Sequence, residues 1–184
     1  MKENKENRVC PAAKAGEFDN KLRRLAQNPR KILSPYIEKG MTVLDLGCGP
    51  GFFTIEIAKL LDNTGKVIAA DLQDEMLDIL NKKINGSDLQ SVIELHKCEV
   101  DSTAVKEKVD FILAFYVVHE IPDHAGLFKE LRFILKPGGK ILIVEPSTHV
   151  SKSDFKNMIL IAESEGFKST DAKKMFFSRA VTLE

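Results

Sequence analysis

Residues Val43–Thr54 read VLDLGCGPGFFT and join an apolar run to a loop that has a glycine at every second position. The apolar run predicts a buried strand, and the amphipathic stretch Phe52–Leu61 that follows predicts a helix. Glycine permits positive φ angles and lacks the Cβ that would hold a ligand away from the backbone. The start of a helix offers unpaired N–H groups. The stretch therefore predicts a strand, a ligand-binding loop and a helix.

The same alternation of strand and helix continues along most of the chain. Four more apolar runs are predicted strands, at residues 66–70, 91–96, 109–118 and 140–144. Helical patterns follow them, at residues 74–84, at a short stretch after 96, at 124–135 and at 153–165. Pro137-Gly138-Gly139 is expected to end the helix that precedes the strand 140–144. Apolar strands that alternate with helices are typical of parallel sheets covered on both faces.

The last part of the chain departs from this alternation. Residues 167–174 (FKSTDAKK) and 175–183 (MFFSRAVTL) have no helix between them and predict an antiparallel hairpin at the sheet edge. We therefore expect an α/β fold with a doubly wound, mostly parallel, seven-stranded Rossmann-like sheet and an antiparallel edge hairpin.

The N-terminal residues form a helical preface to this unit. Glu17–Gln27 and Pro29–Ile37 carry helical patterns, and Asn20, Arg23 and Arg24 either line the site as a lid or form a solvated helix face. We divide the chain into a preface or lid at residues 1–28 and a main domain at residues 29–182. Residues 183–184 are interpreted as a possible tag remnant without a structural role.

Composition excludes several classes of protein. The longest apolar run, Phe111–Val118, is far shorter than the roughly 20 residues that cross a bilayer, and the first residues lack the apolar core of a signal peptide. A cytoplasmic location is therefore expected. Basic and acidic residues balance at 27 each, so charge supports neither a nucleic-acid nor a membrane partner. Cys10, Cys48 and Cys98 form no C-x-x-C pair, which argues against disulfides and zinc.

The glycine spacing argues against a dinucleotide ligand. A G-x-G-x-x-G motif that starts at Gly47 requires a third glycine where Phe52 stands. Asp45, just before the loop, would repel a pyrophosphate but attract a cation. Asp71, at the end of the next predicted strand, is placed to accept both hydrogen bonds of a ribose diol. A ligand that combines an adenosine with a cationic group would match both acids, the cation at Asp45 and the ribose at Asp71.

These motifs resemble those of the class I S-adenosylmethionine-dependent methyltransferases, from about Pro29 to Phe167. The glycine loop corresponds to the first motif of that family and Asp71 to its ribose-binding acid. The segments DFILAFYVVHEIPD, LKPGGKILIVEP and SEGF correspond to its later strands and turns. The resemblance is greatest to the branch of quinone-biosynthesis and arsenite methyltransferases. It implies S-adenosylmethionine as cofactor and a small-molecule methyl acceptor.

The resemblance also implies the roles of individual residues. The methionine moiety would be held by Asp45, Gly47, Cys48, Gly49 and Gly51. The ribose would be bound by Asp71, with Leu72 and Met76 beside the adenine, Glu99 and Val100 near its amino group, and Phe115 closing the methionine side. Glu99-Val100 departs from the usual aspartate-small pair, but glutamate still accepts the same hydrogen bond.

Each of these residues has a plainer interpretation. Asp45 can cap a strand end, Asp71 can cap the next helix, and Cys48 is more simply a small loop residue than a reactive thiol. His119 is a candidate general base, with a structural contact as the alternative. A zinc protease site is not expected, because His124 stands one residue too late for H-E-x-x-H.

Two other functions share this fold. A nicotinamide-dependent oxidoreductase conflicts with Phe52 and Asp45, and a non-catalytic S-adenosylmethionine-binding protein requires only the pocket. The acceptor and the oligomeric state are left open by the sequence.

Overall fold

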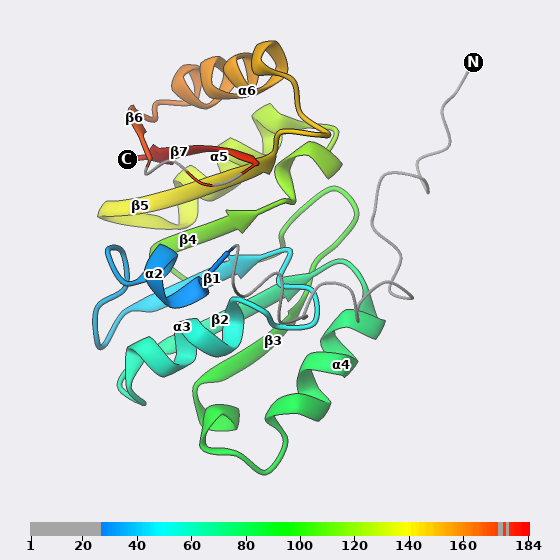
Figure 1. Ribbon diagram of the computed structural model, residues 1–184, viewed down its shortest axis with the longest axis vertical. Helices are drawn as coiled ribbons and strands as arrows, with labels where there is room; N and C mark the ends of the chain where they lie inside the picture. The colour runs from blue at the N-terminus through cyan, green and yellow to red at the C-terminus, as the bar shows by residue number, and fades with distance from the viewer. Residues whose placement is uncertain (1–26, 173–174, 176) are drawn as a thin grey trace.

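In the computed structural model, described for residues 27–172, 175 and 177–184, helices cover both faces of one central sheet (Figure 1). The sheet has seven strands in the order β3-β2-β1-β4-β5-β7-β6. The strands are β1 Thr42–Leu46, β2 Lys66–Asp71, β3 Ile93–Lys97, β4 Val109–Phe115, β5 Leu135–Pro146, β6 Ser169–Asp171 and β7 Ser178–Leu183. Strands β1 to β5 pair in parallel, and β7 runs antiparallel to β5 and β6. The predicted fold class and the edge hairpin are confirmed.

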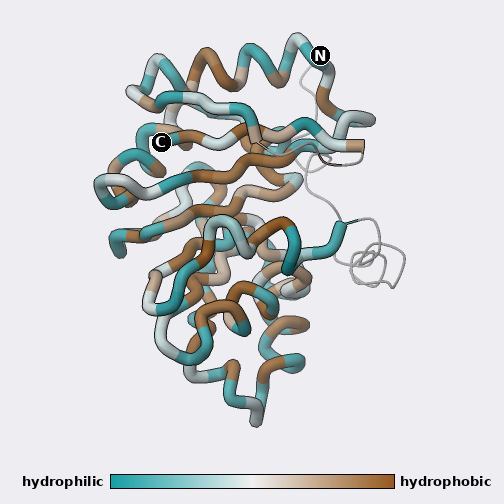
Figure 2. The backbone as a smooth tube through the Cα atoms, turned by 60° about the vertical axis from the view of Figure 1, so that its left-hand side comes forward, coloured by the Kyte–Doolittle hydropathy of each residue, from teal (hydrophilic) through white to brown (hydrophobic). Residues whose placement is uncertain are grey.

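Two apolar clusters hold the layers together. The helices are α2 Pro29–Leu33, α3 Thr54–Leu61, α4 Asp74–Ile84, α5 His124–Ile134 and α6 Lys152–Ser164, with 3-10 turns η3 Asp88–Ser91 and η4 Val118–Glu120. One cluster joins α2, α3 and α4 to one face of the sheet, and the other joins α5 and α6 to the opposite face. Figure 2 shows hydrophobic residues concentrated along the central strands. Near-continuous burial of β4 agrees with a parallel strand covered on both faces.

The strand order reverses between β1 and β4. From β1 the chain proceeds to β2 and β3 on one side, and then crosses to β4 and β5 on the other. Loops that leave the two central strands diverge at such a reversal, so a crevice opens beyond their carboxyl ends. The glycine loop after β1 lies at this position.

Several predicted elements differ from those in the structure, including the strand predicted at residues 109–118, which ends at Phe115. The short helix expected after β3 is not formed: residues 98–108 are a loop, in which Thr103 donates from its backbone N and Oγ1 to Glu130 on α5, both at 2.9 Å. These hydrogen bonds to the Glu130 side chain hold the loop in place without a helix. Strand β5 starts at Leu135 rather than Lys140, because Leu135 pairs with Val109 across a register shift before the main ladder resumes.

Residues 183–184 were expected to have no structural role, and the structure differs from that expectation. Leu183 is fully buried in β7, where it pairs with Ile141 and Ser169. Glu184 exchanges backbone hydrogen bonds with Lys168 at 2.9 and 3.0 Å. The interpretation without a structural role was wrong, because the end of the chain completes the edge hairpin.

Truncation of Leu183 should therefore destabilise the domain. Leu183→Ala is expected to lower the free energy of unfolding by about 2–3 kcal/mol, because it removes buried methyl groups and leaves a cavity. Urea unfolding followed by circular dichroism measures this loss, with the exposed Leu160→Ala as a matched control. A loss no larger than that of the control would contradict the assignment of Leu183 to the core.

The other predictions for the N-terminal part concern residues 1–26, which lie outside the described residues. They are the helix Glu17–Gln27, the role of Cys10 and the lid residues Asn20, Arg23 and Arg24. The short helix predicted at Pro29 is present as α2, where the Asn28 side chain caps Lys31 N–H. In the described part of the chain, no helix combines the length and apolarity needed to cross a membrane.

Candidate functional site

A cavity of about 370 Å³ lies at the carboxyl ends of the central strands, where the strand order reverses. The predicted cofactor residues that line it are Asp45, Gly47, Cys48, Gly49, Asp71, Leu72, Met76, Glu99, Val100 and Phe115. Gly51 and His119 are not part of the lining. Segments far apart in the sequence thus meet at one cavity, as the parallel topology requires.

The glycines of the loop have different surroundings. A Cβ on Gly47 would lie 2.6 Å from Val117 Cγ2, and a Cβ on Gly51 would lie 2.4 Å from Leu80 Cδ1. These two glycines permit close packing against the loop after β4 and against α4. Gly49 has a φ of +52°, and a Cβ there would meet no atom within 4 Å. The loop therefore leaves open space at Gly49, on the wall of the cavity.

Asp45 is buried at the end of β1, with 2% of its surface exposed. The Oγ1 of Thr54, the first residue of α3, donates a hydrogen bond of 2.6 Å to its Oδ2. A buried carboxylate is costly without such partners, so the bond to Thr54 holds the acid in place beside the glycine loop. Asp45 thus joins strand and helix while lining the cavity.

Asp71 ends β2 and binds the loop directly. Its Oδ2 accepts the backbone N–H of Gly49 at 2.8 Å, and its Oδ1 accepts that of Gln73 at 2.9 Å. Burial raises the pKa of Asp71 above its ordinary value, although these N–H groups favour the charged form. The backbone N–H of Leu72 also contributes to holding the carboxylate. A carboxylate has about four acceptor positions, so Asp71 can accept a further hydrogen bond without releasing the loop.

Carboxylates dominate the charged groups around the cavity. The lining includes Asp45, Asp71, Glu99, Asp101, Glu120, Asp123 and Glu130, and among the described residues it contains no lysine, arginine or histidine. Such a lining opposes a pyrophosphate and favours a ligand with positive charge. These carboxylates therefore fit S-adenosylmethionine, whose sulfonium and amino groups are cationic, better than a dinucleotide.

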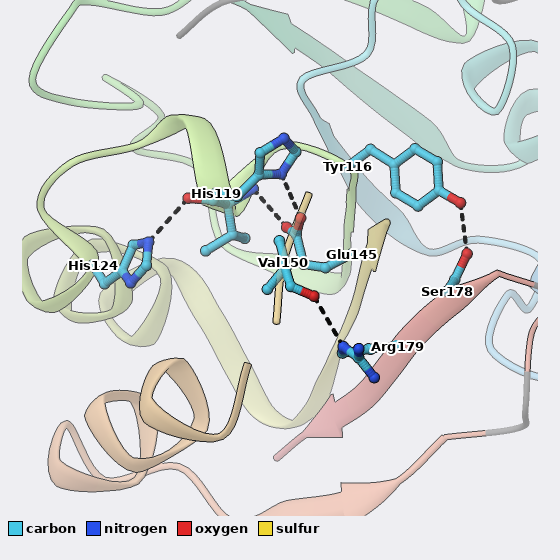
Figure 3. A network of polar contacts seen from close by, with 8 residues as sticks. Tyr116, His119, His124, Glu145, Val150, Ser178 and Arg179 are labelled. Carbon is cyan, nitrogen blue, oxygen red and sulfur yellow. Dashed lines mark hydrogen bonds and ion pairs between the residues drawn. The ribbon is translucent and has the colours of Figure 1, made fainter. Parts of the chain in front are cut away.

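Aromatic rings form the wall at the end of β4. Phe53 and Phe115 have ring centroids 4.2 Å apart, and Phe115 and Tyr116 have centroids 4.5 Å apart. Tyr116 has a φ of +62°, which is unusual for a bulky residue and is associated with functional sites. Its hydroxyl accepts a hydrogen bond from Gln27 Nε2 at 2.6 Å. It also lies 2.5 Å from Ser178 Oγ, to which it is hydrogen-bonded (Figure 3). Tyr116 thus connects the end of β4 with β7 and with Gln27, two residues before α2.

His119 lies in η4, beside the cavity. Its Nδ1 is 2.5 Å from Oε2 of Glu145, a fully buried residue near the end of β5 (Figure 3). Burial opposes a charge on the imidazole, but the hydrogen bond and charge of Glu145, with a contribution from Glu120, outweigh it and raise the pKa of His119. His119 was predicted from the sequence as a candidate base, but Glu145 was not, because it is distant in sequence and resembles an ordinary strand-end residue.

The two described cysteines have no partner in a disulfide. Cys48 and Cys98 are buried free thiols on the cavity wall. Burial, with the nearby carboxylates, raises the pKa of Cys48, and that of Cys98 is raised to about 12. Both thiols are protonated at neutral pH, which supports the structural interpretation of Cys48.

Comparison with known families decides the class of this domain. The model of a family described as "Methyltransferase domain" matches residues 37–178. The chain belongs to this family. It is a class I S-adenosylmethionine-dependent methyltransferase domain, and S-adenosylmethionine is its cofactor.

Individual relatives agree with this methyltransferase assignment. A demethylmenaquinone methyltransferase of Lactobacillus johnsonii is 35% identical over 112 residues, covering 60% of this chain and 46% of that protein. The chain spans about half the length of the curated relatives that it matches. A solved S-adenosylmethionine-dependent methyltransferase from Aquifex aeolicus has a TM-score of 0.83 and 26% identity, covering 95% of this chain and 97% of that one. Fibrillarin of Aeropyrum pernix, solved with natively bound S-adenosylmethionine, shares the fold at a TM-score of 0.64 and 16% identity, covering 80% and 67%.

Proposed function

We propose that this domain transfers the methyl group of S-adenosylmethionine to a small-molecule acceptor. The observation that carries the proposal is that Asp45, Asp71 and the open loop position at Gly49 share one cavity whose lining is acidic. The acids supply acceptors for cationic and diol groups, while the glycine leaves room for the ligand at the backbone.

The roles of the cavity residues follow from their positions. Asp71 would accept both ribose hydroxyls, while Leu72 and Met76 would contact one side of the adenine and Glu99 would accept its amino group. Asp45, Gly47, Cys48 and Gly49 would surround the methionine moiety. Phe115 would close this end, with the aromatic face of Tyr116 available to a cationic sulfonium. Gly51 contributes by packing on Leu80 rather than from the lining.

The chemistry requires mainly positioning from the protein. The bound cofactor supplies an electrophilic methyl group, and the chain holds donor and acceptor in line while excluding water. The walls of the cavity are suited to this task, because buried apolar side chains such as Phe52, Phe53 and Phe115 adjoin the carboxylates.

The acceptor is proposed to be a small aromatic molecule of the quinol type. The relative from Lactobacillus johnsonii is named for a demethylmenaquinone acceptor, and the aromatic wall of Phe53, Phe115 and Tyr116 offers a stacking surface for a ring. The balanced charge of the chain supports no nucleic-acid partner.

Thermal unfolding with S-adenosylmethionine, S-adenosylhomocysteine and NADH tests the cofactor side of the proposal. At one hundred times the Kd, a ligand adds about 2.7 kcal/mol, which raises the midpoint of a domain of this size by roughly 5–10 °C. We expect this shift with the two sulfur compounds and none with NADH. A shift with NADH alone would instead support the oxidoreductase alternative.

A further inference from the structure

A network of hydrogen bonds holds the turn that follows β4. Oε1 of Glu145 accepts the backbone N–H of Val118 at 2.9 Å, and Nε2 of His124 on α5 bonds the carbonyl of Val118 at 3.1 Å (Figure 3). The backbone N–H and carbonyl of Val118 are therefore both hydrogen-bonded by side chains from other elements. The turn carries His119 in one orientation as a result.

Glu145 is unusual because it is a completely buried carboxylate with a histidine partner. Its exposed fraction is 0%, and its two oxygens are used by Val118 N–H and by His119 Nδ1. A buried acid with no other function is costly to retain. Since a carboxylate accepts hydrogen bonds, Nδ1 of His119 carries the proton in this contact, and the neutral ring then has its lone pair on Nε2.

Within the described part of the chain, the Nε2 of His119 has no hydrogen-bond partner. No hydrogen bond to it is formed by residues 27–172, 175 or 177–184, and 24% of the side-chain surface is exposed. Figure 3 shows this nitrogen on the side of the ring away from Glu145. His119 is not itself part of the cavity lining, but Val117 and Glu120 on either side of it are, so the turn that carries the ring borders the cavity.

We propose that His119 and Glu145 form a proton-accepting pair on the acceptor side of the site, in which Glu145 positions His119 and Nε2 receives the acceptor's proton. The inference rests on the proposed function. As the acceptor atom bonds to the methyl carbon, the carbon–sulfur bond breaks and the acceptor's proton passes to Nε2. The positive charge lost from the sulfonium then resides on the imidazolium, next to the Glu145 carboxylate.

The charged groups around the ring favour this transfer. Glu145 of β5 and Glu120 of η4 both raise the pKa of His119. The ring of His149, in the loop after β5, lies 5.9 Å away by centroids, and His124 of α5 binds the Val118 carbonyl. Arg179 of β7 pairs opposite Glu145 in the ladder, but its Nε donates to the Val150 carbonyl at 3.0 Å.

The protonation of His119 tests the pair without an acceptor. Long-range ¹H–¹⁵N correlation spectra of the full chain should show the neutral ring protonated at Nδ1, with a pKa above the ordinary value of about 6.5. Glu145→Gln should lower that pKa and move the proton to Nε2, because the amide donates to Nδ1. His124→Gln removes the other anchor of the turn and should leave the tautomer unchanged. A wild-type ring protonated at Nε2, or an equal response to both substitutions, would overturn the proposal.

The pH dependence of turnover gives a second test. With an acceptor that is turned over, kcat/KM should rise as pH passes the His119 pKa measured by NMR, because the neutral ring is the base. His119→Gln should abolish this rise and lower kcat by about 10²-fold, while leaving the S-adenosylmethionine Kd within about twofold. This variant serves even if Glu145→Gln does not fold. An unchanged profile would overturn the pair, whereas failure of the wild type to bind S-adenosylmethionine would overturn the proposed function.

Discussion

Asp71→Ala is expected to lower the affinity for S-adenosylmethionine by about 10²- to 10⁴-fold. Asp71 lines the cavity and is placed to accept both ribose hydroxyls. Hydrogen bonds to a charged group contribute about 1.5–3 kcal/mol each, and 1.4 kcal/mol corresponds to a tenfold change in Kd. The substitution also releases the N–H groups of Gly49 and Gln73. Isothermal titration calorimetry measures the change.

The control for this experiment is the neighbouring acid Asp74. Asp74 lies in the first turn of α4, is 74% exposed and pairs with Lys97 at 2.7 Å. Asp74→Ala removes a similar charge without altering the cavity lining, so the Kd should change by less than about twofold. Asp71→Asn keeps one acceptor oxygen and should fall between the two. Equal Kd values for Asp71→Ala and wild type would remove this residue from the proposed ribose site.

Gly51→Ala and Gly49→Ala should separate packing from ligand binding within one loop. At Gly51 the added methyl would lie 2.4 Å from Leu80 Cδ1, and the φ of +88° is strained for alanine. Overpacking and backbone strain together should lower the free energy of unfolding by about 2–5 kcal/mol. Gly49→Ala meets no atom and should cost only about 1–2 kcal/mol from its positive φ.

The two substitutions should affect S-adenosylmethionine binding in the opposite order, with the larger loss of affinity at Gly49. The methyl group of Gly49→Ala stands in the open space at the cavity wall, so we expect at least a tenfold loss of S-adenosylmethionine affinity. Gly51→Ala, where folded, should bind more tightly than Gly49→Ala. Urea unfolding and calorimetry on both variants measure the two quantities. If Gly49→Ala binds as tightly as wild type, the ligand does not approach the backbone at Gly49.

Local patterns were sufficient to predict most of the sheet and the two acids of the candidate site, whereas the roles of the other cofactor residues were implied by the family resemblance. The strands β1 and β2 have strong apolar runs, and Asp45, Gly49 and Asp71 lie at their carboxyl ends, where parallel topology brings them together. Their convergence follows from the order of the elements alone, so no knowledge of side-chain packing was needed.

What the sequence did not reveal depends on contacts between distant residues. Glu145 is separated from His119 by 26 positions, and nothing in the pattern around it distinguishes a buried partner from an exposed strand end. The loop at residues 98–108 was predicted to be partly helical because its attachment through Thr103 to Glu130 is tertiary. Leu183 was dismissed for a similar reason, since its burial depends on pairing with β5.

Release of S-adenosylhomocysteine from the purified protein and S-adenosylmethionine tests the central claim most directly. Mass spectrometry should detect the product with at least one member of an acceptor panel of quinols, phenols, amines, thiols and arsenite, and none without an acceptor. We expect the quinols to be methylated. Tight binding of S-adenosylmethionine with no S-adenosylhomocysteine from any member would contradict the account and indicate a domain that binds the cofactor without methyl transfer.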